Sequence, residues 1–146
     1  MALHIPTCTI LIVDDDPDDV FFSRRALKAA GITNAIRVAS NGETAINVLF
    51  GDQARKGDSA ERIGLVLLDK RMPRLDGEAL LQRMKAEPRL ASIPVIMLTG
   101  LADVSLVERV RAGGALACLQ KPLDVDELRA ALESIPGETL CPSEAS

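Results

Sequence analysis

Short apolar segments alternate with helix-forming segments along almost the whole sequence, and this alternation constrains the fold more than any other feature. Three of the five apolar segments are almost continuously apolar, which is typical of parallel strands buried on both faces of a sheet. The segments between them carry helical signals, so we expect a helix after each strand. The predicted strands occupy residues 8–13, 35–40, 63–69, 94–100 and 115–120.

The first helical segment has the clearest boundaries. Asp16 suits the N-cap, and Pro17 suits the first helical position because no hydrogen-bond donor is needed there. Asp18 and Asp19 complement the positive end of the helix dipole, and Gly31 suits a left-handed C-cap. The other helices are predicted at residues 42–50, 76–87, 102–112 and 124–134.

Strict alternation of strands and helices predicts right-handed βαβ units and a sheet covered by helices on both faces. We therefore predict an α/β fold of the flavodoxin-like, doubly wound (βα)5 type, with a five-stranded parallel sheet in the order 2-1-3-4-5. A chain of 146 residues can form one such domain around its own core. We expect this domain at residues 7–135, with a polar loop at residues 51–62 and a flexible C-terminal tail at residues 136–146.

Charge and cysteine content favour a soluble cytoplasmic protein. Lys and Arg total 17 and Asp and Glu total 21, and the net charge of −4 argues against a nucleic-acid or membrane partner. Cys8, Cys118 and Cys141 show no metal-binding spacing and are predicted to be reduced thiols. No signal peptide opens the sequence, and no apolar stretch approaches the roughly 20 residues that span a bilayer.

A set of charged and hydroxyl residues stands at the carboxyl ends of four predicted strands. Ligands of open parallel sheets bind beyond these ends, near the point where the strand order reverses. We therefore expect three carboxylates, one hydroxyl and one ammonium to meet at one edge of the sheet. The set comprises Asp14, Asp15, Asp69, Thr99 and Lys121.

These residue types suit phosphoryl transfer. Carboxylates at close range cannot all stay ionised unless a cation lies among them or one takes a proton, and hard oxygen ligands suit Mg²⁺. A carboxylate can also accept a phosphoryl group as an aspartyl phosphate. The reaction needs positioning and charge neutralisation, which a metal ion, an ammonium and a hydroxyl can supply.

Four segments, ILIVDDD, LVLLDKRMPRLDG, PVIMLTG and LQKPLD, resemble the receiver domains of two-component response regulators in order and at comparable spacing. The resemblance spans about residues 7–135. It implies that Asp69 is the phosphoacceptor and that Asp14 and Asp15 hold Mg²⁺. It also implies that the backbone carbonyl of Arg71 is a further metal ligand.

The same resemblance assigns roles around the phosphoryl group. Thr99 would bond one phosphoryl oxygen, with the backbone N–H of Gly100 nearby, and Lys121 would pair with another. The step from Lys121 to Pro122 resembles one that is commonly cis in receiver domains. Gly77 is expected to relax the entry into the helix that follows the acceptor.

Two positions depart from the family pattern. Cys118 stands three residues before Lys121, where receivers usually carry an aromatic residue whose rotamer reports phosphorylation, and the chain has no Tyr or Trp. We therefore expect movement of the helix at 102–112, or of a loop, to carry the signal. Gly100 stands where alanine is commoner and is expected to loosen the loop after Thr99.

The sequence predicts a stand-alone phosphoryl-accepting signalling module of a two-component phosphorelay, and not an enzyme. A sensor histidine kinase is expected to phosphorylate Asp69, and a downstream protein or phosphotransfer partner to respond. The Asp-Pro-Asp-Asp start and the long loop also resemble the small regulators paired with bacterial phytochromes, which points to a bacteriophytochrome as the kinase. A homodimer through residues 102–112, 115–120 and 124–134 is a further expectation.

Two alternatives stay open at this point. A phosphatase of the haloacid-dehalogenase type also uses an aspartyl phosphate and Mg²⁺, but it needs a carboxylate two residues after the nucleophile, where this chain has Arg71. A receiver-like scaffold without phosphate turnover is disfavoured because all the site residues are present. Asp16, Asp18 and Asp19 are interpreted mostly as capping and dipole residues.

Overall fold

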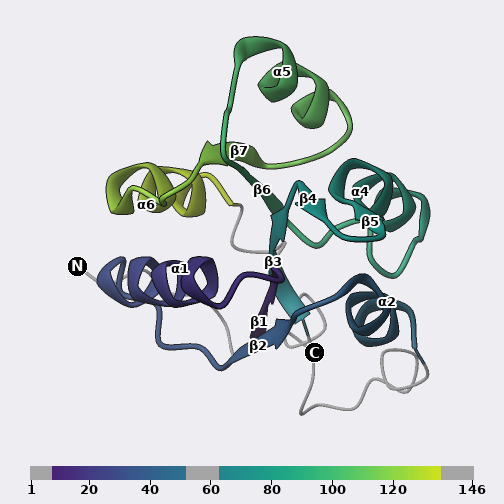
Figure 1. The fold of residues 1–146 in the computed structure, drawn as a ribbon, viewed down its shortest axis with the longest axis horizontal. Helices are drawn as coiled ribbons and strands as arrows, with labels where there is room; N and C mark the ends of the chain where they lie inside the picture. Colours follow the sequence, from purple (N-terminus) through teal and green to yellow (C-terminus); the bar gives the residue numbers. More distant parts are fainter. Residues whose placement is uncertain (1–7, 52–62, 136–146) are drawn as a thin grey trace.

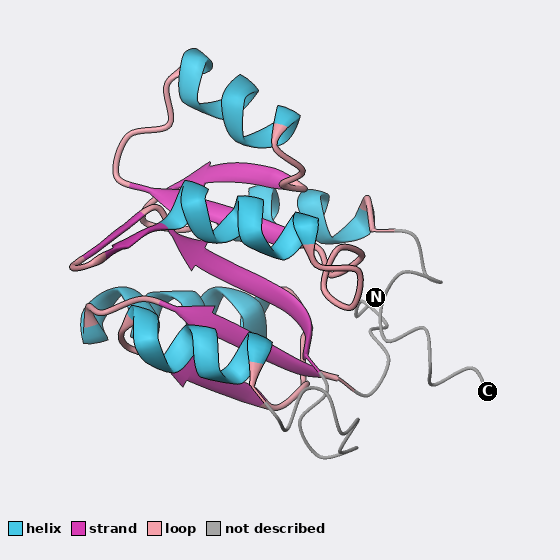
Figure 2. Cartoon of the chain, turned by 90° about the vertical axis from the view of Figure 1, so that its right-hand side faces the viewer, coloured by secondary structure: helices cyan, strands magenta, loops and turns pink. Residues whose placement is uncertain are grey.

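A computed structural model describes residues 8–51 and 63–135 of the chain. Figure 1 shows a central sheet with helices on both of its faces, and Figure 2 shows the same layers after a quarter turn. The expected loop at residues 51–62, apart from its first residue, and the expected tail at residues 136–146 lie outside the described residues.

The sheet confirms the predicted fold. Its strands are parallel and lie in the order β2-β1-β3-β6-β7, which is the predicted order 2-1-3-4-5 when only these five strands are numbered. Every residue of β1 and β6 is buried, which explains their continuous apolar sequences. The strands are β1 (Thr9–Val13), β2 (Ile36–Ala39), β3 (Ile63–Asp69), β6 (Val95–Thr99) and β7 (Ala117–Gln120).

Each described helix begins after an Asp or Asn whose side chain accepts a backbone N–H of the first turn. The first helix matches its predicted boundaries, since Asp16 is the N-cap, Pro17 is the first residue and Gly31 follows the helix with a φ of 91°. No helix in the described part of the chain is both long and apolar enough to cross a lipid bilayer. The helices are α1 (Pro17–Ala29), α2 (Gly42–Phe50), α4 (Gly77–Ala86), α5 (Val104–Ala112) and α6 (Val125–Glu133).

The two faces of the sheet carry separate hydrophobic cores, because successive strand residues point to opposite sides. Leu67 belongs to the core shared with Leu27 of α1 and Leu128 of α6. Leu68 belongs to the other core, which includes Leu80 of α4 and residues of α2 and α5. This burial on both faces fixes the strand ends that carry the site.

A short hairpin after β3 was not predicted. Its strands, β4 (Arg71–Met72) and β5 (Leu75–Asp76), pair antiparallel and connect β3 to α4. Arg74 in the turn has a φ of 64°, a left-handed conformation that is uncommon for residues other than glycine. The two turn residues are Pro73 and Arg74, and not the Asn-Gly or Asp-Gly pair that usually signals a hairpin, while Asp76-Gly77 stands at the start of α4.

The cysteines differ in part from the prediction of reduced thiols. Cys8 is disulfide-bonded, so the prediction is wrong for this residue. Cys118 is a free thiol, and burial raises its pKa because the thiolate is poorly solvated there. Cys141 lies outside the described residues. The spacing of the three cysteines in the sequence gave no signal of this disulfide.

Candidate functional site

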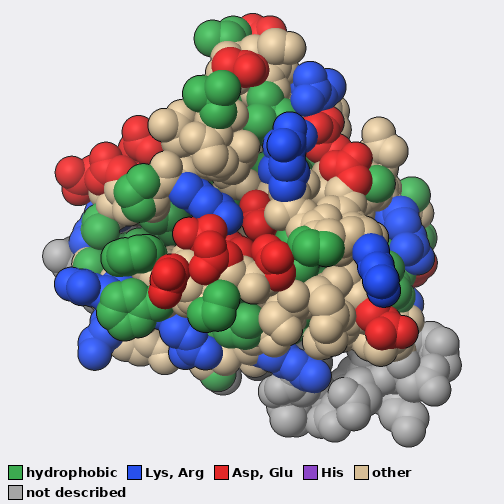
Figure 3. All heavy atoms as spheres, viewed as in Figure 1, with side chains coloured by type: hydrophobic (Ala, Val, Ile, Leu, Met, Phe, Trp, Pro, Cys, Tyr) green, Lys and Arg blue, Asp and Glu red, His purple; other side chains and the backbone are tan. Residues whose placement is uncertain are grey.

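The carboxyl ends of four neighbouring strands bring the predicted residues to one edge of the sheet. Asp14 follows β1, Asp69 ends β3, Thr99 ends β6 and Lys121 follows β7. Figure 3 shows acidic side chains gathered near the centre of the viewed face, where Figure 1 places the N-terminal start of α1 beside β3. The predicted meeting of carboxylates and ammonium at this edge is present in the structure.

Asp14, Asp15 and Asp69 form a group that can hold a metal ion. Each offers one carboxylate oxygen, and these oxygens all lie within 4.8 Å of one another. Asp14 and Asp69 are buried, with exposed fractions of 1% and 7%, whereas Asp15 is exposed. Two buried carboxylates and one that is open to solvent suit Mg²⁺, which binds oxygen ligands and keeps several waters.

Asp14 is held at both of its carboxylate oxygens. Oδ1 accepts the backbone N–H of Asp16 at 3.0 Å, and Oδ2 accepts a hydrogen bond from the Lys121 ammonium at 3.1 Å. Asp16 is also the N-cap of α1, so the start of this helix orients the Asp14 carboxylate. The acidic run after β1 therefore contributes to the site and to the helix through adjacent residues.

Asp69 lacks full compensation of its charge. Burial raises the pKa of its carboxyl group above the usual value, and the neighbouring charge of Asp14 acts in the same direction, while Lys121 opposes them. Oδ1 lies 3.3 Å from the Lys121 ammonium and accepts the backbone N–H of Arg71 at 3.3 Å. A cation beside such a buried, incompletely neutralised carboxylate would stabilise its ionised form.

Lys121 has three carboxylate partners. Its ammonium nitrogen lies 2.8 Å from Asp19, 3.1 Å from Asp14 and 3.3 Å from Asp69. Burial alone would lower the pKa of this lysine, but the hydrogen bonds and charges of the three carboxylates raise it, so the side chain stays charged. The peptide bond to Pro122 is cis, as the resemblance implied.

The contact of Asp19 with Lys121 was missed by the sequence analysis. Asp19 stands in the first turn of α1, as predicted, but its carboxylate also accepts a hydrogen bond from the lysine. The two residues are 102 positions apart in the chain, and a single charged residue in a helical first turn carries no signal of such a partner.

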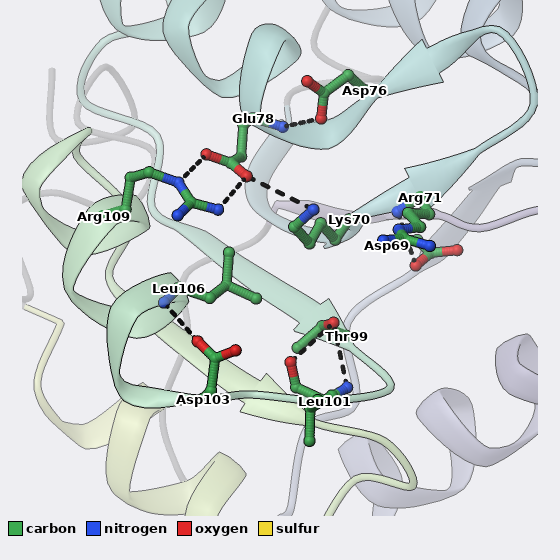
Figure 4. Close-up of polar contacts among 10 residues, drawn as sticks. All are labelled: Asp69, Lys70, Arg71, Asp76, Glu78, Thr99, Leu101, Asp103, Leu106 and Arg109. Carbon is green, nitrogen blue, oxygen red and sulfur yellow. Dashed lines mark hydrogen bonds and ion pairs between the residues drawn. The ribbon is translucent and has the colours of Figure 1, made fainter.

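Thr99 and Asp69 line the same cavity of about 510 Å³. The Thr99 hydroxyl accepts the backbone N–H of Leu101 at 3.3 Å and donates to the Leu101 carbonyl oxygen at 3.4 Å, as Figure 4 shows. Thr99 does not cap α5, because Asp103 is the N-cap and accepts the backbone N–H of Leu106. The Thr99 hydroxyl is therefore bonded to the backbone of Leu101 at the wall of the cavity that Asp69 also lines.

Gly77 allows α4 to approach the backbone behind Asp69. A Cβ atom at this position would lie 2.7 Å from the backbone oxygen of Asp69 and 2.9 Å from the Cα atom of Lys70. The backbone N–H of Gly77 donates to the Lys70 carbonyl at 2.9 Å. Gly77 is thus required because a side chain would collide with the backbone of Asp69 and Lys70. The sequence had suggested only that this glycine relaxes the entry into the helix.

Glu78 connects the segment after Asp69 to α5, as Figure 4 shows. Its carboxylate accepts two hydrogen bonds from the Arg109 guanidinium, at 2.8 and 3.0 Å, and lies 3.6 Å from the Lys70 ammonium. The hydrogen bonds from Arg109 lower the pKa of Glu78 despite some opposing burial. This link joins the segment after Asp69 to a helix that lines the cavity.

Sequence comparisons agree with the geometry of the site. Residues 10–133 match the family model described as response regulator receiver domain. The sporulation initiation phosphotransferase F of Bacillus subtilis is 32% identical over 124 residues, which cover 85% of this chain and 90% of that protein. The transcriptional regulatory protein DctD of Pseudomonas aeruginosa is 35% identical over 131 residues, 85% of this chain, but the chain spans only 25% of that protein.

Solved structures agree as well. The bacteriophytochrome response regulator AtBRR superposes with a TM-score of 0.75 at 29% identity, over 88% of this chain and 92% of that one. The Mn²⁺-bound form of response regulator Rcp1 gives a TM-score of 0.66 at 26% identity, over 88% and 91% of the two chains. A divalent cation in a relative of this fold accords with the carboxylate group found here.

Proposed function

The chain belongs to the response regulator receiver domain family, and on this basis we propose that it accepts a phosphoryl group on Asp69 in a Mg²⁺-dependent reaction. The observation that carries the proposal is the meeting of three carboxylates and one ammonium at the sheet edge. The chain then acts as a signalling module and not as an enzyme that turns over a substrate.

Each site residue has a defined part in this proposal. Asp14, Asp15 and Asp69 hold the ion together with the backbone carbonyl of Arg71, and bound Mg²⁺ neutralises charge on the phosphoryl oxygens. A carboxylate oxygen of Asp69 forms a bond to phosphorus while the bond from phosphorus to the donor histidine breaks. An aspartyl phosphate and a free histidine result.

The Lys121 ammonium and the Thr99 hydroxyl donate hydrogen bonds to phosphoryl oxygens in this proposal. Support comes from Lys121 lying 3.3 Å from Asp69 and from Thr99 lining the same cavity as Asp69. Such donors favour the transition state because they face the oxygens on which negative charge is spread.

A sensor histidine kinase is the proposed phosphoryl donor, and similarity to AtBRR supports a bacteriophytochrome in this role. A downstream protein or a phosphotransfer partner responds, as similarity to the sporulation phosphotransferase suggests. The net charge of −4 supports a protein partner over nucleic acid or an anionic membrane surface. We propose that this signalling takes place in the cytoplasm.

A homodimer through α5, β7 and α6 also remains a proposal. Two exposed apolar side chains support it: Leu101, in the loop before α5, is 68% exposed, and Val104, the first residue of α5, is 73% exposed. Light scattering before and after phosphorylation tests the dimer, with Val104→Asp as a variant that disrupts it. A wild-type chain that stays monomeric in both states contradicts this part.

Phosphorylation is tested by intact-mass measurement. The chain is incubated with Mg²⁺ and a small acyl phosphate, and we expect one phosphoryl adduct that is stable in acid and labile in base. Asp69→Asn is expected to show no adduct. An unmodified wild-type chain would favour the scaffold alternative, and an adduct that persists in Asp69→Asn would contradict the assigned acceptor.

The phosphatase alternative gives a different result in the same assay. Continuous hydrolysis of added phosphomonoesters would favour an enzyme of the haloacid-dehalogenase type. Arg71 argues against that chemistry, because a guanidinium cannot supply the acid and base steps of the required carboxylate. We therefore expect a stoichiometric adduct without continuous hydrolysis.

A further inference from the structure

Lys121 has a carboxylate partner that does not belong to the metal-binding group. The contact from its ammonium to Asp19, at 2.8 Å, is shorter than the contacts to Asp14 and Asp69. Asp14 and Asp69 form the metal-binding group together with Asp15, and Asp19 is outside that group. The shortest ion pair of the lysine therefore involves a residue that the proposed phosphoryl chemistry leaves unexplained.

Two different parts of the fold set this contact. Asp19 lies in the first turn of α1, which begins where Asp16 accepts the backbone N–H of Asp18. Lys121 comes from the loop after β7, where its backbone N–H donates to the Thr99 carbonyl at 2.8 Å. The side chains of Lys121 and Asp19 are only 17% and 32% exposed, so water weakens their attraction less than at an open surface.

We propose that Asp19 is a positioning residue that holds the Lys121 ammonium beside Asp69 and competes with an incoming phosphoryl group for its charge. This inference rests on the proposed phosphorylation of Asp69. An ammonium donates three hydrogen bonds, and Lys121 has one carboxylate neighbour for each of them. A phosphoryl oxygen replaces Asp69 as the third partner while Asp14 and Asp19 keep the ammonium in place.

Asp19 affects the reaction in two ways of opposite sign. As a hydrogen-bond acceptor it orients Lys121 towards the acceptor. As a negative charge it weakens the attraction of the ammonium for phosphoryl oxygens and repels an anionic donor. Asparagine keeps an acceptor oxygen but removes the charge, and alanine removes both, so the two variants separate the effects.

The first test measures the phosphorylation rate against the concentration of a small acyl phosphate, with Mg²⁺ present throughout. We expect Asp19→Asn to lower the half-saturating donor concentration by about threefold, the effect of one partly shielded charge, with little change in the maximal rate. Asp19→Ala is expected to lower the maximal rate by at least about threefold, because the lysine is less well positioned.

Asp18→Asn is the matched control. Asp18 is exposed, lies in the same helical turn and contributes the same charge to the helix dipole, but it is outside the carboxylate set around Lys121. We expect the half-saturating donor concentration of Asp18→Asn to equal that of the wild type. An effect through the stability of α1 would appear in both variants, whereas an effect through Lys121 appears only at Asp19.

A second test observes the lysine without phosphorylation. The NMR signal of the Lys121 ammonium, assigned by its absence in Lys121→Arg, reports slow proton exchange when the group is held by acceptors. We expect the signal in the wild type and in Asp18→Ala, and its loss in Asp19→Ala. This measurement does not depend on the phosphoryl donor or on the metal ion.

The outcomes separate this inference from the proposed function. Wild-type phosphorylation with an unchanged donor dependence in Asp19→Asn, or an ammonium signal that survives Asp19→Ala, overturns the inference alone. A wild-type chain that takes up no phosphoryl group overturns the proposed function and the competing role of Asp19 with it. A lower half-saturating donor concentration in Asp19→Asn, together with loss of the ammonium signal in Asp19→Ala, supports both the competing and the positioning role of Asp19.

Discussion

At the scale of single residues, the position of Asp69 depends on a close contact with α4. The backbone oxygen of Asp69 and the Cα atom of Lys70 leave no room for a Cβ atom on Gly77. We predict that Gly77→Ala lowers the free energy of unfolding by about 1–3 kcal/mol, the usual cost of an extra methyl group in a tight space. Urea unfolding measures this loss.

Gly100→Ala is the control for that prediction, because a Cβ atom on Gly100 would meet no atom within 4 Å. Its stability is expected to equal or exceed that of the wild type, since alanine restricts the unfolded chain more than glycine does. Equal stabilities of the two alanine variants would contradict the proposed close contact at Gly77.

The ionised carboxylate of Asp69 is predicted to lower the free energy of unfolding when no metal ion is bound. Burial raises the pKa of its carboxyl group above 3.8, so the ionised form is less stable in the folded chain than in the unfolded chain. This cost is fully present above the raised pKa and disappears as the pH falls towards 3.8.

Asp69→Asn is therefore expected to raise the free energy of unfolding at pH 7 in the presence of a chelator by about 1 kcal/mol, a common size for single substitutions. Thermal melts at several pH values measure the gain, which should shrink as the solution becomes acidic. An asparagine variant that is less stable than the wild type at pH 7 would be incompatible with this account.

At the scale of elements, α5 buries fewer residues than any other described helix. It buries only Leu106 and Val110, and the hydrogen bonds between Glu78 and Arg109 connect it to α4. The position where receivers usually carry the aromatic switch residue is Cys118 here. Movement of α5 is therefore the expected structural response at this face, as the sequence analysis proposed.

We predict that Glu78→Gln increases amide hydrogen exchange in α5 by about threefold, the effect of losing one surface ion pair. The pKa of Glu78 lies below 4.5, so the link is fully present above pH 4.5 and is lost as the pH falls through the lowered pKa. Glu108→Gln, at an exposed position on α5, is the control. Equal amide exchange of α5 in Glu78→Gln and Glu108→Gln would contradict the proposal that Glu78 holds α5 in place.

At the scale of the whole molecule, the sequence predicted the features that arise from local signals. Buried parallel strands and the caps of α1 follow from neighbouring residues, so the strand order and the site edge were predicted. The contacts of Lys121 with Asp19 and of Arg109 with Glu78 were missed, because they join residues far apart in the chain. The disulfide of Cys8 was also missed, because the spacing of the cysteines in the sequence shows no pairing pattern.

Metal binding is predicted to stabilise the whole domain. An ion that binds only the folded chain raises the free energy of unfolding by about 2.7 kcal/mol at a hundredfold excess over its Kd. Thermal melts with increasing Mg²⁺ measure this gain, and Asp15→Asn should need a higher Mg²⁺ concentration for the same shift. An identical Mg²⁺ response in Asp15→Asn would exclude this carboxylate as a ligand.

The most direct test of the central claim locates the phosphoryl group. Hydroxylamine converts an acyl phosphate to a hydroxamate, which leaves a stable mark on the residue that was phosphorylated. After incubation with a small acyl phosphate and hydroxylamine treatment, peptide mapping should find the mark at Asp69, and only when Mg²⁺ was present. A mark at Asp14, Asp15 or Asp19, or the same yield at Asp69 in the presence of a chelator, would contradict the account.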